Sequence, residues 1–122
     1  MVFGSFDGPQ ETYAAFLDEA RTHGEYIIAV VAHDNLIEHL TGELPVFDFS
    51  ERFAALKDQG RVHEVIVDNG EMGIGELIET KKPDIIALGS DQDMLKEAIE
   101  AELERLNEPI EVKVLQAFES NK

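Results

Sequence analysis

Apolar residues fall into two alternating patterns along this chain. Short runs of consecutive, often β-branched apolar residues alternate with segments in which apolar residues recur every three or four positions. The run 26–32 is the most continuous and predicts a strand buried on both faces, while 93–106 has the clearest helical spacing. The predicted strands are 2–6, 26–32, 64–67, 84–88 and 111–115, and the predicted helices are 11–23, 35–40, 51–59, 71–81 and 93–106.

The order of these elements predicts an α/β fold. Strands that alternate with helices pair in parallel through right-handed crossovers, because a short hairpin joins only antiparallel neighbours. We therefore expect a three-layer, Rossmann-like, doubly wound parallel sheet of five strands, covered by helices on both faces. No linker or repeat divides the sequence, so residues 1–122 are predicted to form a single domain.

The junction between the first strand and the first helix is the earliest candidate for chemistry. Glycines at positions 4 and 8 and a proline at position 9 predict a sharp turn before the helix. The free backbone N–H groups at a helix N-terminus, together with the helix dipole, attract phosphate. In parallel sheets this end of the helix lies at the carboxyl edge, so the turn predicts a phosphate-binding cleft there.

Charge and composition exclude several kinds of partner. The chain carries 26 acidic and 10 basic residues, a net charge of −16, which argues against binding to nucleic acid or to an anionic membrane. It contains no cysteine, so a thiolate zinc site and a thiol nucleophile are excluded. No apolar run is long enough to span a membrane and no signal-like segment opens the chain, so a cytoplasmic location is expected.

Several ordered segments resemble one enzyme family. Gly4, Phe6 and Asp7 match the opening of a G-x-F-D-x-x-H-x-G-H motif, and 82–92, K-P-D-I-I-A-L-G-S-D-Q, is close to a segment of archaeal members. Both resemble nucleotidyltransferases of the cytidylyltransferase type, such as glycerol-3-phosphate cytidylyltransferase and archaeal FAD synthase. The resemblance covers nearly the whole chain and implies the strand order 3-2-1-4-5, a homodimer, and a cleft for CTP or ATP with Mg²⁺.

The chain departs from the family motif at the residues to which the resemblance assigns the chemistry. Gln10 and Tyr13 stand where the motif has its two histidines, and Thr12 stands at its glycine. Thr41 stands at the position of a phosphate-binding lysine, and Glu11 adds a carboxylate beside the phosphate position. Because nucleotidyl transfer depends on positioning and on positive charge around the phosphates, these differences predict the loss of most of the rate.

Three functions follow as hypotheses. The first is a catalytically inactive, engineered protein on a cytidylyltransferase-like scaffold, whose nucleotide pocket has been rebuilt or silenced. The second is a CTP- or ATP-dependent nucleotidyltransferase that releases pyrophosphate and works through non-standard residues. The third is a designed enzyme that uses the introduced cleft residues.

The candidate site residues lie at the ends of the predicted strands and in the loops that follow them. They are Phe3, Gly4, Ser5, Asp7, Gln10, Glu11, Tyr13, His33, Thr41, Gly89, Ser90, Asp91 and Gln92. We expect a small-molecule ligand in this cleft. No metal site is predicted, and no cofactor is expected, except that Mg²⁺ would accompany CTP or ATP under the second hypothesis.

Overall fold

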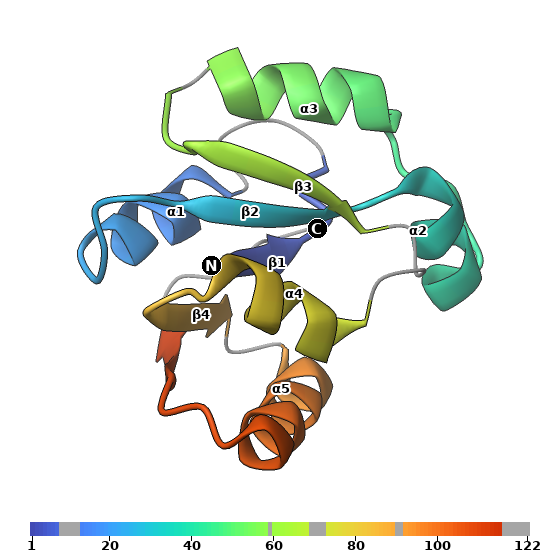
Figure 1. Ribbon diagram of the computed structural model, residues 1–122. Helices are drawn as coiled ribbons and strands as arrows, with labels where there is room; N and C mark the ends of the chain where they lie inside the picture. The colour runs from blue at the N-terminus through green and yellow to red at the C-terminus, as the bar shows by residue number, and fades with distance from the viewer. Residues whose placement is uncertain (8–12, 59, 69–72, 90–91, 116–122) are drawn as a thin grey trace.

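A computed structural model of the chain describes residues 1–7, 13–58, 60–68, 73–89 and 92–115. These residues form five strands and five helices, which alternate along the sequence except that two helices follow the second strand. Figure 1 shows their arrangement. The strands are β1 (Val2–Gly4), β2 (Ile28–Ala32), β3 (Glu64–Asp68), β4 (Ile85–Gly89) and β5 (Glu111–Leu115). The helices are α1 (Ala14–Arg21), α2 (Asp34–Thr41), α3 (Phe49–Asp58), α4 (Ile74–Lys81) and α5 (Asp93–Leu106).

The sheet confirms the predicted fold. Its order is β3-β2-β1-β4-β5, and each neighbouring pair is parallel. This is the order that the family resemblance implied. The chain therefore runs from β1 outward to β3, then returns past β1 to β4, so the direction of winding reverses between β1 and β4.

Several element boundaries differ from the predicted ones. β1 ends at Gly4 rather than at position 6, because Phe6 adopts a left-handed backbone conformation with φ 51° that no strand can continue. α3 begins two residues earlier than predicted, where Asp48 and Glu51 form a reciprocal capping pair. α2 begins at Asp34, with His33 as its N-cap residue.

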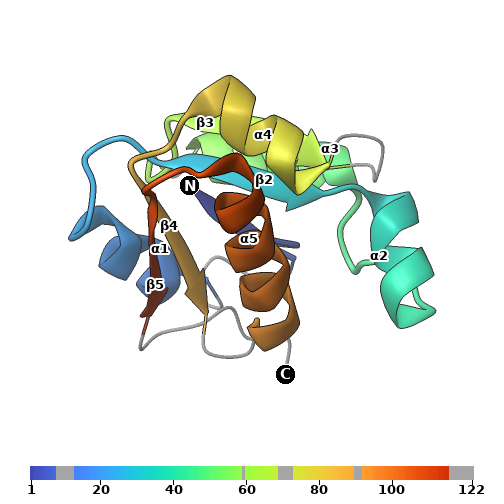
Figure 2. The same ribbon diagram turned by 60° about the horizontal axis from the view of Figure 1, so that its bottom comes forward.

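Two apolar cores lie on opposite faces of the sheet. α1 and α3 supply Phe16, Leu17 and Leu56 to the first core, whereas α4 and α5 supply Leu77, Ile99 and others to the second. Figure 2 shows α4 and α5 together on one side of the sheet. Consecutive residues of β2 alternate between the cores, as expected for a strand covered on both faces. α2 lies beyond the carboxyl end of β2 (Figure 1), so it extends the edge at which parallel strands end.

The α-ammonium group of Met1 is partly buried at the opposite, amino-terminal edge of the sheet. It donates a hydrogen bond of 2.9 Å to the carbonyl of Ile85. Burial lowers the pKa of this amine from 8.0 to about 6, and the nearby Asp84 carboxylate opposes that change. Below about pH 6 the folded protein therefore holds a partly desolvated charge that the unfolded chain would keep in water.

This amine predicts a pH dependence of stability. Between about pH 6 and pH 8 the unfolded chain holds this proton more tightly than the folded chain, so the free energy of unfolding should rise with pH by about 2 kcal/mol. Urea unfolding at several pH values measures this directly. The Nα-acetylated chain is the control, because it lacks the titrating group and should lose this rise. An identical pH profile for both forms would contradict the assignment.

Candidate functional site

A cleft of about 550 Å³ lies at the carboxyl edge of the sheet, beside the predicted chemistry. Its floor comes from the ends of β1, β2 and β3, and its walls from α2, the loop after α2, and the start of α5. The lining residues are Phe3, Gly4, Ser5, Asp7, Val30, Ala32, Leu36, Ile37, Thr41, Glu43, Leu44, Val46, Asp68, Gln92 and Leu95. A second cavity, of about 390 Å³, lies at the amino-terminal edge. We place the candidate site at the carboxyl edge, where open α/β sheets bind their ligands.

A buried arginine fixes the floor of this cleft. Arg52 is only 2% exposed, and its Nη1 donates to the carbonyls of Ser5 at 2.6 Å and of Ala32 at 2.7 Å. Its Nε donates to the carbonyl of Phe47 at 3.0 Å, and its Nη2 pairs with Asp34 Oδ1 at 2.6 Å. One side chain therefore joins the ends of β1 and β2, the loop after α2, and α2 itself.

Asp7 holds the loop that forms one wall. Its Oδ2 accepts a hydrogen bond of 2.7 Å from the backbone N–H of Val46, and its Oδ1 accepts one of 2.9 Å from that of Phe47. Hydrogen bonds to an ionised carboxylate are about twice as strong as neutral ones. The same loop is also held through the Phe47 carbonyl by Arg52. Both backbone N–H groups and a backbone carbonyl of this loop are therefore held by hydrogen bonds.

Gln92 connects β4 to β1 where the direction of winding reverses. Its Oε1 accepts a hydrogen bond of 2.8 Å from Gly89 N, and its Nε2 donates one of 3.0 Å to the carbonyl of Phe3. Both polar ends of the amide are used, so the side chain is fixed at the cleft. A glutamate or an alanine at this position would break at least one of the two connections.

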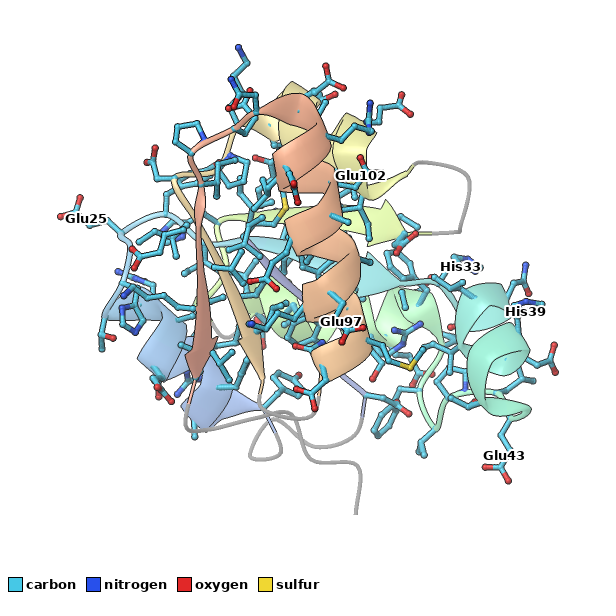
Figure 3. The ribbon with its side chains drawn as sticks, turned by 90° about the horizontal axis from the view of Figure 1, so that it is seen from below. Glu25, His33, His39, Glu43, Glu97 and Glu102 are labelled. Atoms are coloured by element: carbon cyan, nitrogen blue, oxygen red, sulfur yellow. The ribbon has the colours of Figure 1, made fainter. Side chains whose placement is uncertain are left out.

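The described lining of the cleft is acidic on one side and apolar on the other. Asp7, Glu43 and Asp68 contribute carboxylates, and no lysine or arginine is among the described residues that line it. Within the described part of the chain, no group of three or more histidine, cysteine, aspartate or glutamate side chains is arranged to hold a metal ion. Figure 3 shows His33, His39 and Glu43 around α2, and Glu97 and Glu102 along α5. The cleft therefore favours a ligand that brings its own cation or presents an uncharged surface.

The structure brings together six of the predicted site residues. Phe3, Gly4, Ser5, Asp7, Thr41 and Gln92 all line the cleft. Four others, Gln10, Glu11, Ser90 and Asp91, lie outside the described residues. Gly89 ends β4 and contributes its N–H to Gln92, without lining the cleft itself.

Two predicted cleft residues lie elsewhere. Tyr13 is fully buried in the core beside α1, with the edge of its ring against Phe6 at 5.6 Å between ring centroids. It packs on the opposite face of the sheet from Phe3, so it does not fill the cleft. His33 caps α2, because its Nδ1 accepts a hydrogen bond of 3.4 Å from Asn35 N. Its ring stacks on that of Phe49, with the ring centroids 5.5 Å apart.

Thr41 lines the cleft but also serves the end of α2. Its hydroxyl donates to the carbonyl of Ile37 at 2.8 Å and accepts from the N–H of Glu43 at 3.3 Å. Gly42 follows with φ 82°, a left-handed conformation that glycine adopts without strain. The position where the resemblance places a lysine is therefore used to end the helix.

Sequence reasoning missed the apolar wall of the cleft and two of its carboxylates, Glu43 and Asp68. Asp68 is the last residue of β3, and an acidic residue directly after the predicted strand 64–67 was a signal that could have revealed it. Leu36 and Ile37 carry the helical apolar spacing of α2. Leu44 and Val46 flank a proline within a polar loop, and nothing local in the sequence marks them as cleft residues.

Comparison with known proteins defines the class. The model of the cytidylyltransferase-like family matches residues 1–119, so the chain belongs to that family. It is 34% identical over 109 residues to a FAD synthase of Thermococcus sibiricus. The aligned residues make up 89% of this chain and 74% of that protein. It is also 34% identical over 113 residues to a FAD synthase of Pyrococcus horikoshii. Here the aligned residues make up 92% of this chain and 76% of that protein.

A solved structure shares the same architecture. It is described as the lipopolysaccharide core biosynthesis protein from Thermoplasma volcanium and superposes with a TM-score of 0.83. The match covers 97% of this chain and 95% of that chain, at 26% sequence identity. No helix in the described part of this protein is both long enough and apolar enough to cross a membrane.

These comparisons overturn the first functional hypothesis. The expectation of a catalytically inactive, engineered protein is wrong, because the family model spans nearly the whole chain and relatives at 34% identity are named as synthases. The hypothesis of a designed enzyme loses its basis for the same reason. That expectation rested on the differences from the family motif at Gln10, Tyr13 and Thr41.

The arginine at the floor of the cleft predicts a large loss of stability. Arg52→Lys keeps the charge but cannot reach the same four acceptors, so the free energy of unfolding should fall by about 3 kcal/mol. Urea unfolding measures this loss. The control is Arg61→Lys at the exposed pair with Asp18, which should change stability by about 0.5 kcal/mol or less. Equal effects of the two substitutions would show that Arg52 does not organise the cleft.

The buried tyrosine predicts the cost of restoring the family motif. Tyr13→His removes apolar contacts with Phe6 and buries an imidazole, so it should lower the free energy of unfolding by about 2 kcal/mol or more. Tyr13→Phe keeps the ring in place and is the matched control, expected to cost less. Both are measured by chemical unfolding. A Tyr13→His protein as stable as the unaltered chain would place this side chain outside the core.

Proposed function

We propose that this protein is a nucleotidyltransferase that transfers AMP from ATP to FMN and releases pyrophosphate. The observation that carries the proposal is the similarity, over about nine-tenths of the chain, to two proteins named FAD synthase. FAD consists of AMP and FMN joined through a pyrophosphate bond, so this transfer would make it. The cleft at the carboxyl edge of the sheet supports the proposal, because nucleotides bind at that edge in α/β folds.

The reaction needs no redox change and no covalent intermediate. An oxygen of the FMN phosphate would attack the α-phosphorus of ATP, while the bond from that phosphorus to the bridging oxygen of the β-phosphate breaks. Pyrophosphate leaves with the electron pair of that bond. Enzymes accelerate such transfers mainly by positioning the two phosphates and stabilising their charge.

The chain's own residues would contribute shape more than charge. Gln92 fixes the crevice between β1 and β4, and Arg52 holds the ends of β1 and β2. Since the described lining supplies no lysine or arginine, the nucleotide would enter as its magnesium complex, with part of its charge already neutralised. A cytoplasmic location and a homodimer stay predictions from the sequence.

CTP is the alternative nucleotide, because the family to which the chain belongs is described by cytidylyl transfer. The acceptor of the reaction would be unchanged in this case. The two nucleotides differ in the size and hydrogen-bonding groups of the base, so a direct comparison of their kcat/KM values with FMN separates them.

The test is formation of FAD and release of pyrophosphate from ATP and FMN with Mg²⁺. We expect turnover by the unaltered chain, and CTP and glycerol 3-phosphate serve as the alternative donor and acceptor. Gln92→Ala should lower kcat/KM about tenfold or more, because the crevice loses its connection between β4 and β1. Glu104→Ala, exposed near the far end of α5, is the control and should leave the rate unchanged. Absence of product with every donor–acceptor pair would refute the proposal.

A further inference from the structure

Two apolar side chains stand open to solvent at one wall of the cleft. Leu44 is 62% exposed and Val46 is 81% exposed, and both line the cleft from the loop after α2. Leu36 and Ile37 of α2 line the same end, so the apolar surface continues into the cleft. An acidic, highly charged chain gains nothing in solubility from such residues.

The backbone that carries these side chains is held in place. Both oxygens of Asp7 accept hydrogen bonds from the loop, one from Val46 N and one from Phe47 N. Arg52 holds the adjoining carbonyl of Phe47. A charged carboxylate and a buried guanidinium thus fix a segment whose own side chains bury little surface. These hydrogen bonds therefore fix the backbone of the loop while the side chains of Leu44 and Val46 stay exposed to solvent.

The position of this wall indicates which part of a substrate it meets. The winding direction reverses between β1 and β4, and nucleotides in doubly wound sheets bind in the crevice at such a reversal. Gln92 marks that crevice. The wall lies at the other end of the cleft, beside α2 and past the end of β2. Its neighbours include Glu43 and Asp68, whose carboxylates disfavour a phosphate there.

We propose that Asp7 is a positioning residue that fixes Leu44 and Val46 as an apolar wall for the uncharged ring of the acceptor substrate. The inference rests on the proposed transfer to FMN, whose ring system is flat and uncharged. Asp7 would act through the loop, without touching the reacting phosphates. Leu44 and Val46 would then set specificity for a ring-bearing acceptor.

The first experiment removes the wall and leaves the Asp7 hydrogen bonds intact. Leu44→Ser and Val46→Ser should each raise the KM for FMN about threefold to tenfold, with the KM for ATP changed less than about twofold. Fluorescence quenching of riboflavin, which carries the ring without the phosphate, should show the same loss of affinity. Val114→Ser is the matched control, since Val114 is a half-exposed valine on β5 that does not line the cleft.

The second experiment tests Asp7 itself. Asp7→Asn should raise the KM for FMN and weaken riboflavin binding, because its amide group turns a donor toward a loop N–H. Combined with Val46→Ser, its effect on acceptor affinity should be less than additive, because both changes act through one wall. Asp18→Asn, a surface carboxylate bonded to Arg61, is the control. A merely structural Asp7 would lower the melting temperature and leave the KM values unchanged.

The outcomes separate this inference from the proposed reaction. If FAD forms but the serine variants leave both the KM for FMN and riboflavin affinity unchanged, the wall is wrong while the reaction stands. If no FAD forms but riboflavin binds in a manner that depends on Leu44 and Val46, the reaction is wrong while the wall stands. Failure of the unaltered chain to bind riboflavin, or fully additive effects of Asp7→Asn and Val46→Ser, would overturn the inference.

Discussion

The buried guanidinium of Arg52 is the interaction on which the carboxyl edge of the sheet depends. A desolvated cation is costly unless protein acceptors replace its water, and here the acceptors come from four separate segments. They are the chain after β1, the end of β2, α2, and the loop that follows α2. Each segment must be in place before the charge is compensated. The stability of the fold and the shape of the cleft are therefore coupled through one side chain, which also lies over the ring of Phe49.

This use of Arg52 has an electrostatic consequence for the cleft. The arginine nearest the floor donates to protein acceptors, so the described lining presents carboxylates and apolar surface instead of cations. With a net charge of −16, the chain does not attract a bare triphosphate by its overall field. Under the proposed function, recognition would come from shape, from backbone groups and from the cation that accompanies the nucleotide. Rigid connections such as those of Asp7 and Gln92 suit a site that works by positioning.

The sequence predicted the architecture well because buried parallel strands carry a strong local signal. The run that forms β2 is apolar on both faces, and the structure assigns its alternate residues to two cores. The strand order came from the family resemblance, since periodicity cannot supply it. Cleft residues at the ends of β1 and β4 were also predictable, because they follow strands directly. Leu44 and Val46 were not, since their loop is held at the cleft by long-range contacts. The N–H groups of Val46 and Phe47 bond to Asp7, which lies 39 and 40 residues away in the sequence.

The position of Tyr13 and the function were misjudged for two different reasons. Tyr13 shares the helical spacing of Phe16, Leu17 and Ala20, which all lie in the core, and that spacing was better evidence than its place in a motif. The predicted loss of most of the rate assumed that each group of the family motif acts independently and cannot be replaced. Groups that act as a unit in catalysis contribute non-additively, and transfer between phosphates depends chiefly on their alignment. Under the proposed function, the strand order and the hydrogen bonds of Asp7 and Gln92 would keep the scaffold for that alignment, even where the side chains around the phosphates differ.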